Sequence, residues 1–308
     1  MTVVVGLSPG DRARPAVSLG AMLARSVDQR LVVTAVVPEP WPPHPLQIDA
    51  EFLALQASTA ERALAEAKAQ VGDHRAVDYV LRRARSVSSG LLDVAEENEA
   101  SYVVLGSSPS GALHRVAIGG IADRILHSAA VPVVVAPRDF TFRSGNRLSR
   151  ITVAFGRGDG DSDLLARATD RAMSVGADLR VACFAVEPLA PLATLGGAAA
   201  DADALITDRW VDSLKPIIAA TLERSTNRPS ADTVDITVGH GSSWADALTA
   251  IAWTDDEILV IGTSSSPVGR LFLGSHAAKI VRNSPVPVML VPRSVLDRPS
   301  SSPGSAVE

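Results

Sequence analysis

The sequence predicts an α/β protein of two tandem domains, each a five-stranded parallel sheet that is doubly wound, with helices on both faces. Short β-branched runs alternate with longer helical patterns, which is typical of βαβ units. Runs such as "LVVTAVV" and "ILVIG" are almost wholly apolar, as strands covered on both faces should be. The pattern also occurs twice, because "VPVVVAPR" at 131–138 returns as "VPVMLVPR" at 286–293.

The repeat sets the domain boundaries. The stretch "GGIADRILHSAAVPV" returns as "GSHAAKIVRNSPVPV", and the opening "TVVVGLS" resembles the later "RITVAFG". These matches predict a first domain over 1–140 and a second over 148–295. The remaining segment, 296–308, is rich in Ser and Pro and is expected to be a disordered tail.

The two copies are expected to contain the same elements in the same order. In the first copy, the apolar runs predict strands near 2–7, 31–37, 76–82, 101–106 and 132–136. The helical patterns between them predict helices near 12–27, 50–71, 87–98 and 119–129. In the second copy, strands are expected near 150–155, 179–186, 233–238, 257–262 and 287–291, with helices between them. The five prolines of Pro38–Asp49 predict an irregular excursion after the second strand.

The final strand of each copy is apolar and is expected at a sheet edge. An uncovered edge strand of that composition would favour aggregation. We therefore expect the two copies to pack as an intramolecular pseudo-dimer through "VPVVVAP" and "VPVMLVP".

Composition narrows the class of protein. Apolar residues make up 46% of the chain, and the net charge of −5 argues against a nucleic-acid surface, which needs a basic balance or patch. The single cysteine, Cys183, excludes a disulfide framework and favours a reducing compartment. The N-terminus shows neither a signal peptide nor a membrane-spanning run. We expect a cytoplasmic protein without a membrane or nucleic-acid partner.

With these repeats and strand–loop–helix modules, the sequence resembles the universal stress protein family in its tandem form. The resemblance covers 3–138 and 151–293, and it rests on "VVVGLS", the "PVxxxPR" endings and the order of the elements. It implies a domain of the adenine-nucleotide alpha-hydrolase-like kind. Members that bind ATP carry Gly-x2-Gly-x9-Gly-(Ser/Thr) after the fourth strand and an Asp at the end of the first. Small residues let backbone N–H groups approach phosphate oxygens, and a helix N-terminus favours anions.

The first copy keeps the spacing of this pattern with changed residues. It reads Gly106-x2-Pro109-x9-Gly119-Gly120, so the second glycine has become a proline, which lacks an N–H. Ser8 stands where the family has Asp, and it can form hydrogen bonds but carries no charge. The resemblance therefore implies an ATP or AMP site made of Ser8, Gly106, Ser108, Pro109, Gly119, Gly120 and Ile121.

The second copy departs from the pattern differently. Its loop, from Gly262 through Ser265 to Gly274-Ser275, is one residue short. Gly156 stands in the Asp position, and His276 replaces a small apolar residue. The corresponding candidate residues are Gly262, Ser265, Gly274 and Ser275, and we expect the first copy to bind a nucleotide better than the second.

Several residues have simpler structural interpretations. Gly119 and Gly274 could serve only to begin helices that pack close to the sheet. Cys183 lies inside an apolar run and is expected to be a core residue. His240 and His276 lack further ligands, so no metal site is expected. The acidic groups Glu96–Glu99 and Asp255–Glu257 are expected to be solvated turns.

The favoured function is a non-enzymatic stress-response protein whose adenine-nucleotide site is degraded in both copies, with no catalytic residues. One alternative is a nucleotide-free scaffold of the same fold that acts through protein partners, including a homodimer. A less favoured alternative is a nucleotide-hydrolysing enzyme, which needs a cation on the phosphates and a carboxylate for Mg²⁺. Its candidates are the cations Arg115 and Arg270 and the carboxylates Asp123 and Asp159.

Overall fold

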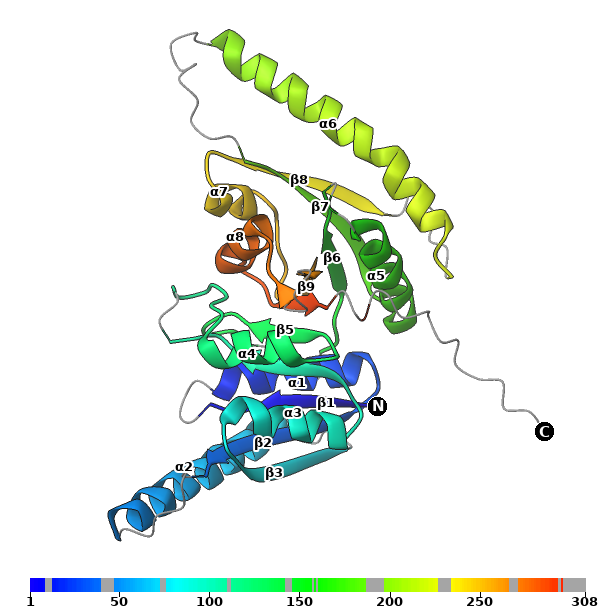
Figure 1. Cartoon of the computed structure of the whole chain (residues 1–308). Coiled ribbons are helices and arrows are strands. Elements are labelled where there is room, and N and C mark those ends of the chain that lie inside the picture. Colours follow the sequence, from blue (N-terminus) through cyan, green and yellow to red (C-terminus); the bar gives the residue numbers. More distant parts are fainter. Residues whose placement is uncertain are drawn as a thin grey trace, which may run out of the picture.

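The computed structural model describes residues 1–8, 13–39, 47–72, 76–109, 112–141, 146–156, 158, 160–186, 197–226, 234–265, 271–292 and 295. The strands of the first copy are β1 (Thr2–Gly6), β2 (Arg30–Pro38), β3 (Val77–Ala84), β4 (Ala100–Gly106) and β5 (Val133–Ala136). Its helices are α1 (Ala13–Ser26), α2 (Gln47–Val71), α3 (Val87–Glu97) and α4 (Gly120–Ser128). Strands and helices alternate as the sequence predicts (Figure 1).

The second copy repeats this order. Its sheet strands are β6 (Arg150–Ala154), β7 (Asp178–Val186), β8 (Asp235–Gly241), β9 (Glu257–Gly262) and β12 (Val288–Val291). Its helices are α5 (Asp161–Val175), α6 (Gly197–Glu223), α7 (Trp244–Thr249) and α8 (Ser275–Asn283). A short antiparallel pair, β10 (Ser264–Ser265) and β11 (Leu271–Phe272), lies between β9 and α8 and was not expected from the sequence.

All ten long strands form one sheet in the order β3-β2-β1-β4-β5-β12-β9-β6-β7-β8. Neighbours within each copy are parallel. The copies meet where β5 pairs with β12 in antiparallel register, Val134 opposite Met289. The predicted fold class of two tandem five-stranded parallel sheets is confirmed, and so is the pairing through the final strands.

Two apolar cores cover the two faces of this sheet and run through both copies. Val3 and Val5 of β1 point into one core with residues of α1, α2, α5 and α6, whereas Val4 points into the other with residues of α3, α4, α7 and α8. The alternation follows from the strand period of two residues. The joint is part of both cores, because Met289 packs in the first and Val288 in the second.

One boundary differs from the expectation. α2 begins at Gln47, inside the stretch that its prolines suggested would be irregular throughout. Residues 40–46 of that stretch and the expected tail, 296–308, lie outside the described residues. Along the described part of the chain, no helix combines the length and apolar character needed to cross a bilayer.

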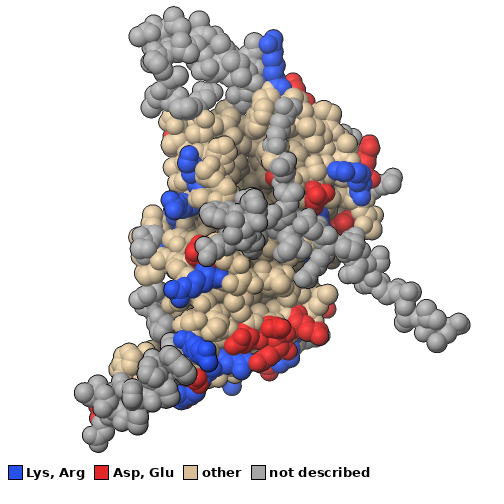
Figure 2. Space-filling model, in the orientation of Figure 1, with Lys and Arg blue, Asp and Glu red and all other residues tan. Residues whose placement is uncertain are grey.

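Two ion pairs lie on the surface of the first copy. Figure 2 shows acidic and basic side chains next to one another at the outer end of the molecule that holds the first copy. Arg30 of β2 pairs with Asp78 of β3, and Arg82 of β3 pairs with Glu97 of α3. These pairs are solvent-accessible, so each adds little to stability.

Glu257 corrects one expectation about the acidic groups. It was expected in a solvated turn, but it is the first residue of β9 and is fully buried. Its Oε1 lies 3.2 Å from Arg180 Nη1 and accepts a hydrogen bond from Thr152. Arg180 Nε also lies 2.9 Å from Asp235 Oδ2. The buried carboxylate therefore has a charged partner, which a buried charge requires.

We expect Glu257→Leu to lower the free energy of unfolding by about 1–3 kcal/mol, because it removes one partner of the buried Arg180 guanidinium, which keeps its ion pair with Asp235. The double variant Arg180→Leu/Glu257→Leu removes both charges and should recover most of that loss. Urea unfolding of the two variants compares them directly. Equal losses in both would show that the ion pair does not hold this end of the second copy.

The third helix of each copy packs closely on the third strand. The glycine that permits this contact lies in the helix in the first copy and in the strand in the second copy. A Cβ added at Gly90, the fourth residue of α3, would lie 2.9 Å from Ala84 Cβ at the end of β3 and 2.8 Å from Val36 Cγ1. In the second copy the glycine is Gly241, at the end of β8, and the fourth helical residue is Ala247. A Cβ at Gly241 would lie 2.7 Å from the Ala247 nitrogen.

Because the glycine lies in the helix in one copy and in the strand in the other, we expect the effects of substitutions at Gly90 and Ala84 on stability to be coupled. Gly90→Ala should cost about 1 kcal/mol net, since overpacking costs roughly 1–3 kcal/mol and the gain in helix propensity returns about 0.5–1 kcal/mol. Ala84→Gly reproduces the second copy's arrangement and should recover part of that cost. A double-mutant cycle by chemical denaturation measures the coupling. Strictly additive losses would contradict the close packing.

Candidate functional site

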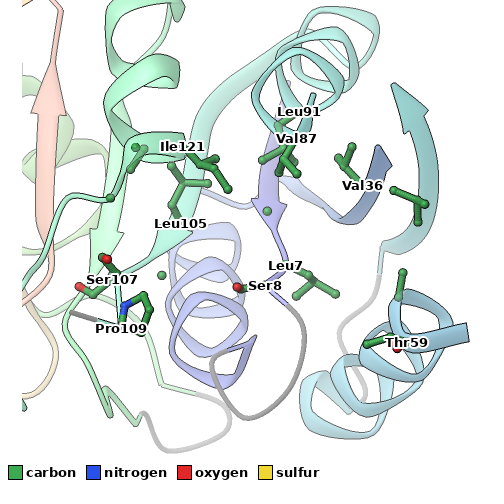
Figure 3. A pocket seen from close by; sticks show the side chains of 18 of the residues that line it. Leu7, Ser8, Val36, Thr59, Val87, Leu91, Leu105, Ser107, Pro109 and Ile121 are labelled. Carbon is green, nitrogen blue, oxygen red and sulfur yellow. The ribbon is translucent and has the colours of Figure 1, made fainter. Parts of the chain in front are cut away.

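A cavity of about 480 Å³ lies in the first copy, beside the carboxyl ends of β1, β2 and β4 (Figure 3). This is the edge at which doubly wound sheets bind ligands. All the candidate residues of the first copy line it: Ser8, Gly106, Ser108, Pro109, Gly119, Gly120 and Ile121. The structure therefore brings together residues that span more than 100 positions of the sequence.

The walls of the cavity are largely apolar. Leu7 follows β1, Val36 comes from β2, Leu105 from β4, and Val87 and Leu91 from α3. Figure 3 shows these side chains around the same space. A volume of this size and an apolar lining are typical of small-molecule pockets.

Helix α2 closes one side of the cavity, and the sequence analysis missed its contribution. Leu55, Gln56, Thr59 and Ala60 line the cavity from this helix. The phosphate-loop pattern concerns one loop and one strand end, so it could not locate them. The available signal was the position of α2, which follows the carboxyl end of β2 and therefore begins at the ligand-binding edge.

None of the described residues that line the cavity carries a charge. Among the described residues, the groups that could stabilise an anion here are hydrogen-bond donors and backbone dipoles. The N-terminus of α4 supplies such donors. Gly119 is its N-cap, no side chain caps it, and Gly120, Ile121 and Ala122 of the first turn line the cavity. The first N–H groups of a helix have no partner inside the helix.

Hydrogen bonds shape the loop between β4 and α4. Ser107 Oγ donates to the Ala136 carbonyl oxygen at 2.6 Å and accepts from the Ala117 N–H at 2.9 Å. The Ser108 N–H donates to the Ala117 carbonyl oxygen at 2.8 Å. Ser107 is therefore occupied by structural bonds, which agrees with the absence of any nucleophile motif around it.

The two glycines that open α4 differ in the space around them. A Cβ at Gly119 would lie 3.1 Å from Ser108 Cβ, whereas a Cβ at Gly120 would meet nothing within 4 Å. The φ angle of Gly119 is −92°, which any residue can adopt. A small residue is therefore required at Gly119, because Ser108 of the loop lies close to it. At Gly120 there is room for a side chain.

Arg115 does not reach the cavity, contrary to the role considered for it in an enzyme. Its guanidinium donates to the Asn283 carbonyl oxygen and lies 3.3 Å from Thr249 Oγ1, both in the second copy. The neighbouring Val116 N–H donates to the Ser284 carbonyl oxygen at 3.3 Å. Asp123 does not line the cavity either, and Arg270 and Asp159 lie outside the described residues.

In the second copy the candidate residues are arranged differently. Gly262 ends β9, and Ser265 lies in β10, opposite Leu271 of β11. Gly274 is the N-cap of α8, and Ser275 is its first residue. Residues 266–270 of the loop lie outside the described part of the chain. The described part of this loop is thus held in a short hairpin.

Cys183 is a core residue. Cys183 is fully buried, and burial raises the pKa of its thiol to about 12, so it is not a thiolate nucleophile at neutral pH. Within the described residues, His, Cys, Asp and Glu form no group of three or more that could hold a metal ion.

Comparison with known proteins places this geometry in context. The profile of the universal stress protein family matches residues 1–137 and 148–292. The chain is 37% identical to a universal stress protein of Mycobacterium tuberculosis over 297 residues, which cover 95% of this chain and all of that one. A Mycobacterium bovis universal stress protein matches to the same extent.

Solved structures support the fold. A universal stress protein from Archaeoglobus fulgidus DSM 4304 superposes with a TM-score of 0.60 at 15% identity, covering 95% of this chain and 98% of that one. A structure described as a putative universal stress protein from Pseudomonas aeruginosa UCBPP-PA14 gives 0.54 at 16% identity, covering 96% and 94%.

Proposed function

This chain belongs to the universal stress protein family in its tandem form, and from that premise we propose that it is a non-enzymatic, cytoplasmic stress-response protein that binds an adenine nucleotide, AMP or ATP, in its first copy. The observation that carries the proposal is the cavity of the first copy. Residues placed by the spacing of the family's loop gather there around one apolar space. One end of that space is the uncapped N-terminus of α4.

The cavity fits the two parts of such a ligand. The apolar side chains of Leu7, Val36 and Leu91 suit the faces of a purine ring, and Ser8 and Thr59 offer hydroxyl groups. The α4 N-terminus suits a phosphate, because backbone N–H groups and the helix dipole favour an anion at that end.

The lining supports binding rather than catalysis. A hydrolase or transferase needs a general acid–base pair or an activated nucleophile beside the ligand. The described residues around this cavity include no Asp, Glu, His, Lys, Arg or Cys. The residues considered for the enzyme alternative point elsewhere or lie outside the described residues.

A nucleotide-free scaffold is the second candidate, and two observations favour it. Pro109 removes one N–H donor from the loop. Leu55 and Ile121, at the cavity, are 62% and 46% exposed, and exposed apolar side chains of this size suit a protein partner. Nucleotide titration separates the two candidates.

We expect Gly119→Val to weaken AMP binding at least tenfold, which is about 1.4 kcal/mol. Its side chain would crowd Ser108 and block the approach of a phosphate to the first turn of α4. Isothermal titration calorimetry of the full chain measures the change.

Gly274→Val is the matched control, because Gly274 is the N-cap of the equivalent helix in the second copy and has open space around it. Unchanged AMP affinity in this variant locates the site in the first copy. Equal weakening by both variants would contradict that location. No binding of AMP or ATP to the wild-type chain at millimolar concentration would favour the scaffold.

Restoring the family's residues should strengthen binding. Gly120→Ser adds a hydroxyl in open space at the start of α4 and should tighten AMP binding by about 0.5–1.5 kcal/mol, the net contribution of one hydrogen bond. Pro109→Gly returns an N–H donor and should also tighten it. Calorimetry and thermal melts of both variants test this, and unchanged affinity in both would show that the loop does not contact the ligand.

A further inference from the structure

Three aromatic rings lie in a row in the second copy. The ring centroids of Phe184 and Trp244 are 6.3 Å apart, and those of Trp244 and His276 are 5.3 Å apart. Phe184 belongs to β7, Trp244 begins α7, and His276 is in the first turn of α8. Separations of this order are those of packed aromatic pairs.

The strand register places Phe184 at the position that Val36 has in the first copy. Thr2 pairs with Arg30 at the start of β2, and Arg150 pairs with Asp178 at the start of β7. Val36 and Phe184 each follow that start by six residues, so they occupy equivalent points of the two sheets.

The first residues of the helices show which first-copy positions correspond to Trp244 and His276. Trp244 is the first residue of α7 after the N-cap Ser243, as Val87 is the first residue of α3 after its own serine N-cap. His276 is the second residue of α8 after its glycine N-cap, as Ile121 is the second residue of α4.

The three equivalent residues of the first copy all line its cavity. Val36, Val87 and Ile121 come from three different elements, and Figure 3 shows them around the same space. Replacing two valines and an isoleucine by three rings would put aromatic groups where a ligand would lie.

We propose that the rings of Phe184, Trp244 and His276 close the ligand site of the second copy, so that the chain binds one ligand, in the first copy. On this proposal, Val36, Val87 and Ile121 keep the first cavity open to a flat heteroaromatic group such as a nucleobase. The nature of that ligand rests on the proposed function, whereas the filling of the second site does not.

Close packing of α7 on β8 holds Trp244 in place. A Cβ at Gly239 of β8 would lie 2.2 Å from the Ala247 carbonyl oxygen, so this helix rests directly on the strand backbone. Ser243 caps the helix through its side chain, which accepts from the Asp246 N–H at 3.2 Å. The backbone at the first residue of α7 is therefore held close to β8.

Exchange of these side chains between the copies tests the proposal. The forward exchange is Val36→Phe with Val87→Trp, and the reverse exchange is Phe184→Val with Trp244→Val. Each full-length variant is titrated with 8-anilinonaphthalene-1-sulfonate, which reports an apolar cavity, and separately with AMP. Circular dichroism confirms that each variant is folded.

We expect one probe site per wild-type chain, none after the forward exchange and two after the reverse exchange. A probe that follows this pattern while AMP binds to no variant supports the inference and overturns the proposed nucleotide instead. The inference is overturned if the wild-type chain binds no probe, or if the forward variant binds it with wild-type strength. A folded reverse variant that still binds one probe overturns it as well. If the reverse variant fails to fold, the forward variant decides.

Discussion

The antiparallel pairing of β5 with β12 is the interaction on which the rest of the molecule depends. Each copy alone would leave an apolar final strand at the edge of a five-stranded sheet, open to association with other chains. Pairing removes both edges at once and makes one sheet of ten strands. The two cores then continue across the joint instead of ending at it.

The joint also connects the second copy to the cavity of the first. The loop that leads from β4 to α4 contacts the end of α8 through Arg115 and Val116, which meet the carbonyl oxygens of Asn283 and Ser284. The same loop continues into the residues that line the cavity. On this account the second copy supports the site of the first, while the rings of Phe184, Trp244 and His276 stand at its own equivalent positions.

Much of the fold could be predicted from the sequence, because buried parallel strands appear as apolar runs and because the repeat marked equivalent elements. The loop spacing also identified the part of the cavity lining that lies near α4. Features that depend on contacts between distant residues could not be predicted. The burial of Glu257 depends on Arg180, far away in the sequence, and the row of rings joins Phe184, Trp244 and His276 from three elements. The β10–β11 pair was missed because two-residue strands leave no periodic pattern.

The central claim is that one tandem chain keeps a single open ligand site, in the first copy. A crystal structure of the full-length protein grown with saturating AMP tests it most directly. The account predicts one AMP per chain, its phosphate at the N–H groups of Gly120 and Ile121, with Phe184, Trp244 and His276 still in contact in the second copy. AMP bound in the second copy, or a first-copy cavity that stays empty beside an occupied site elsewhere, would contradict it.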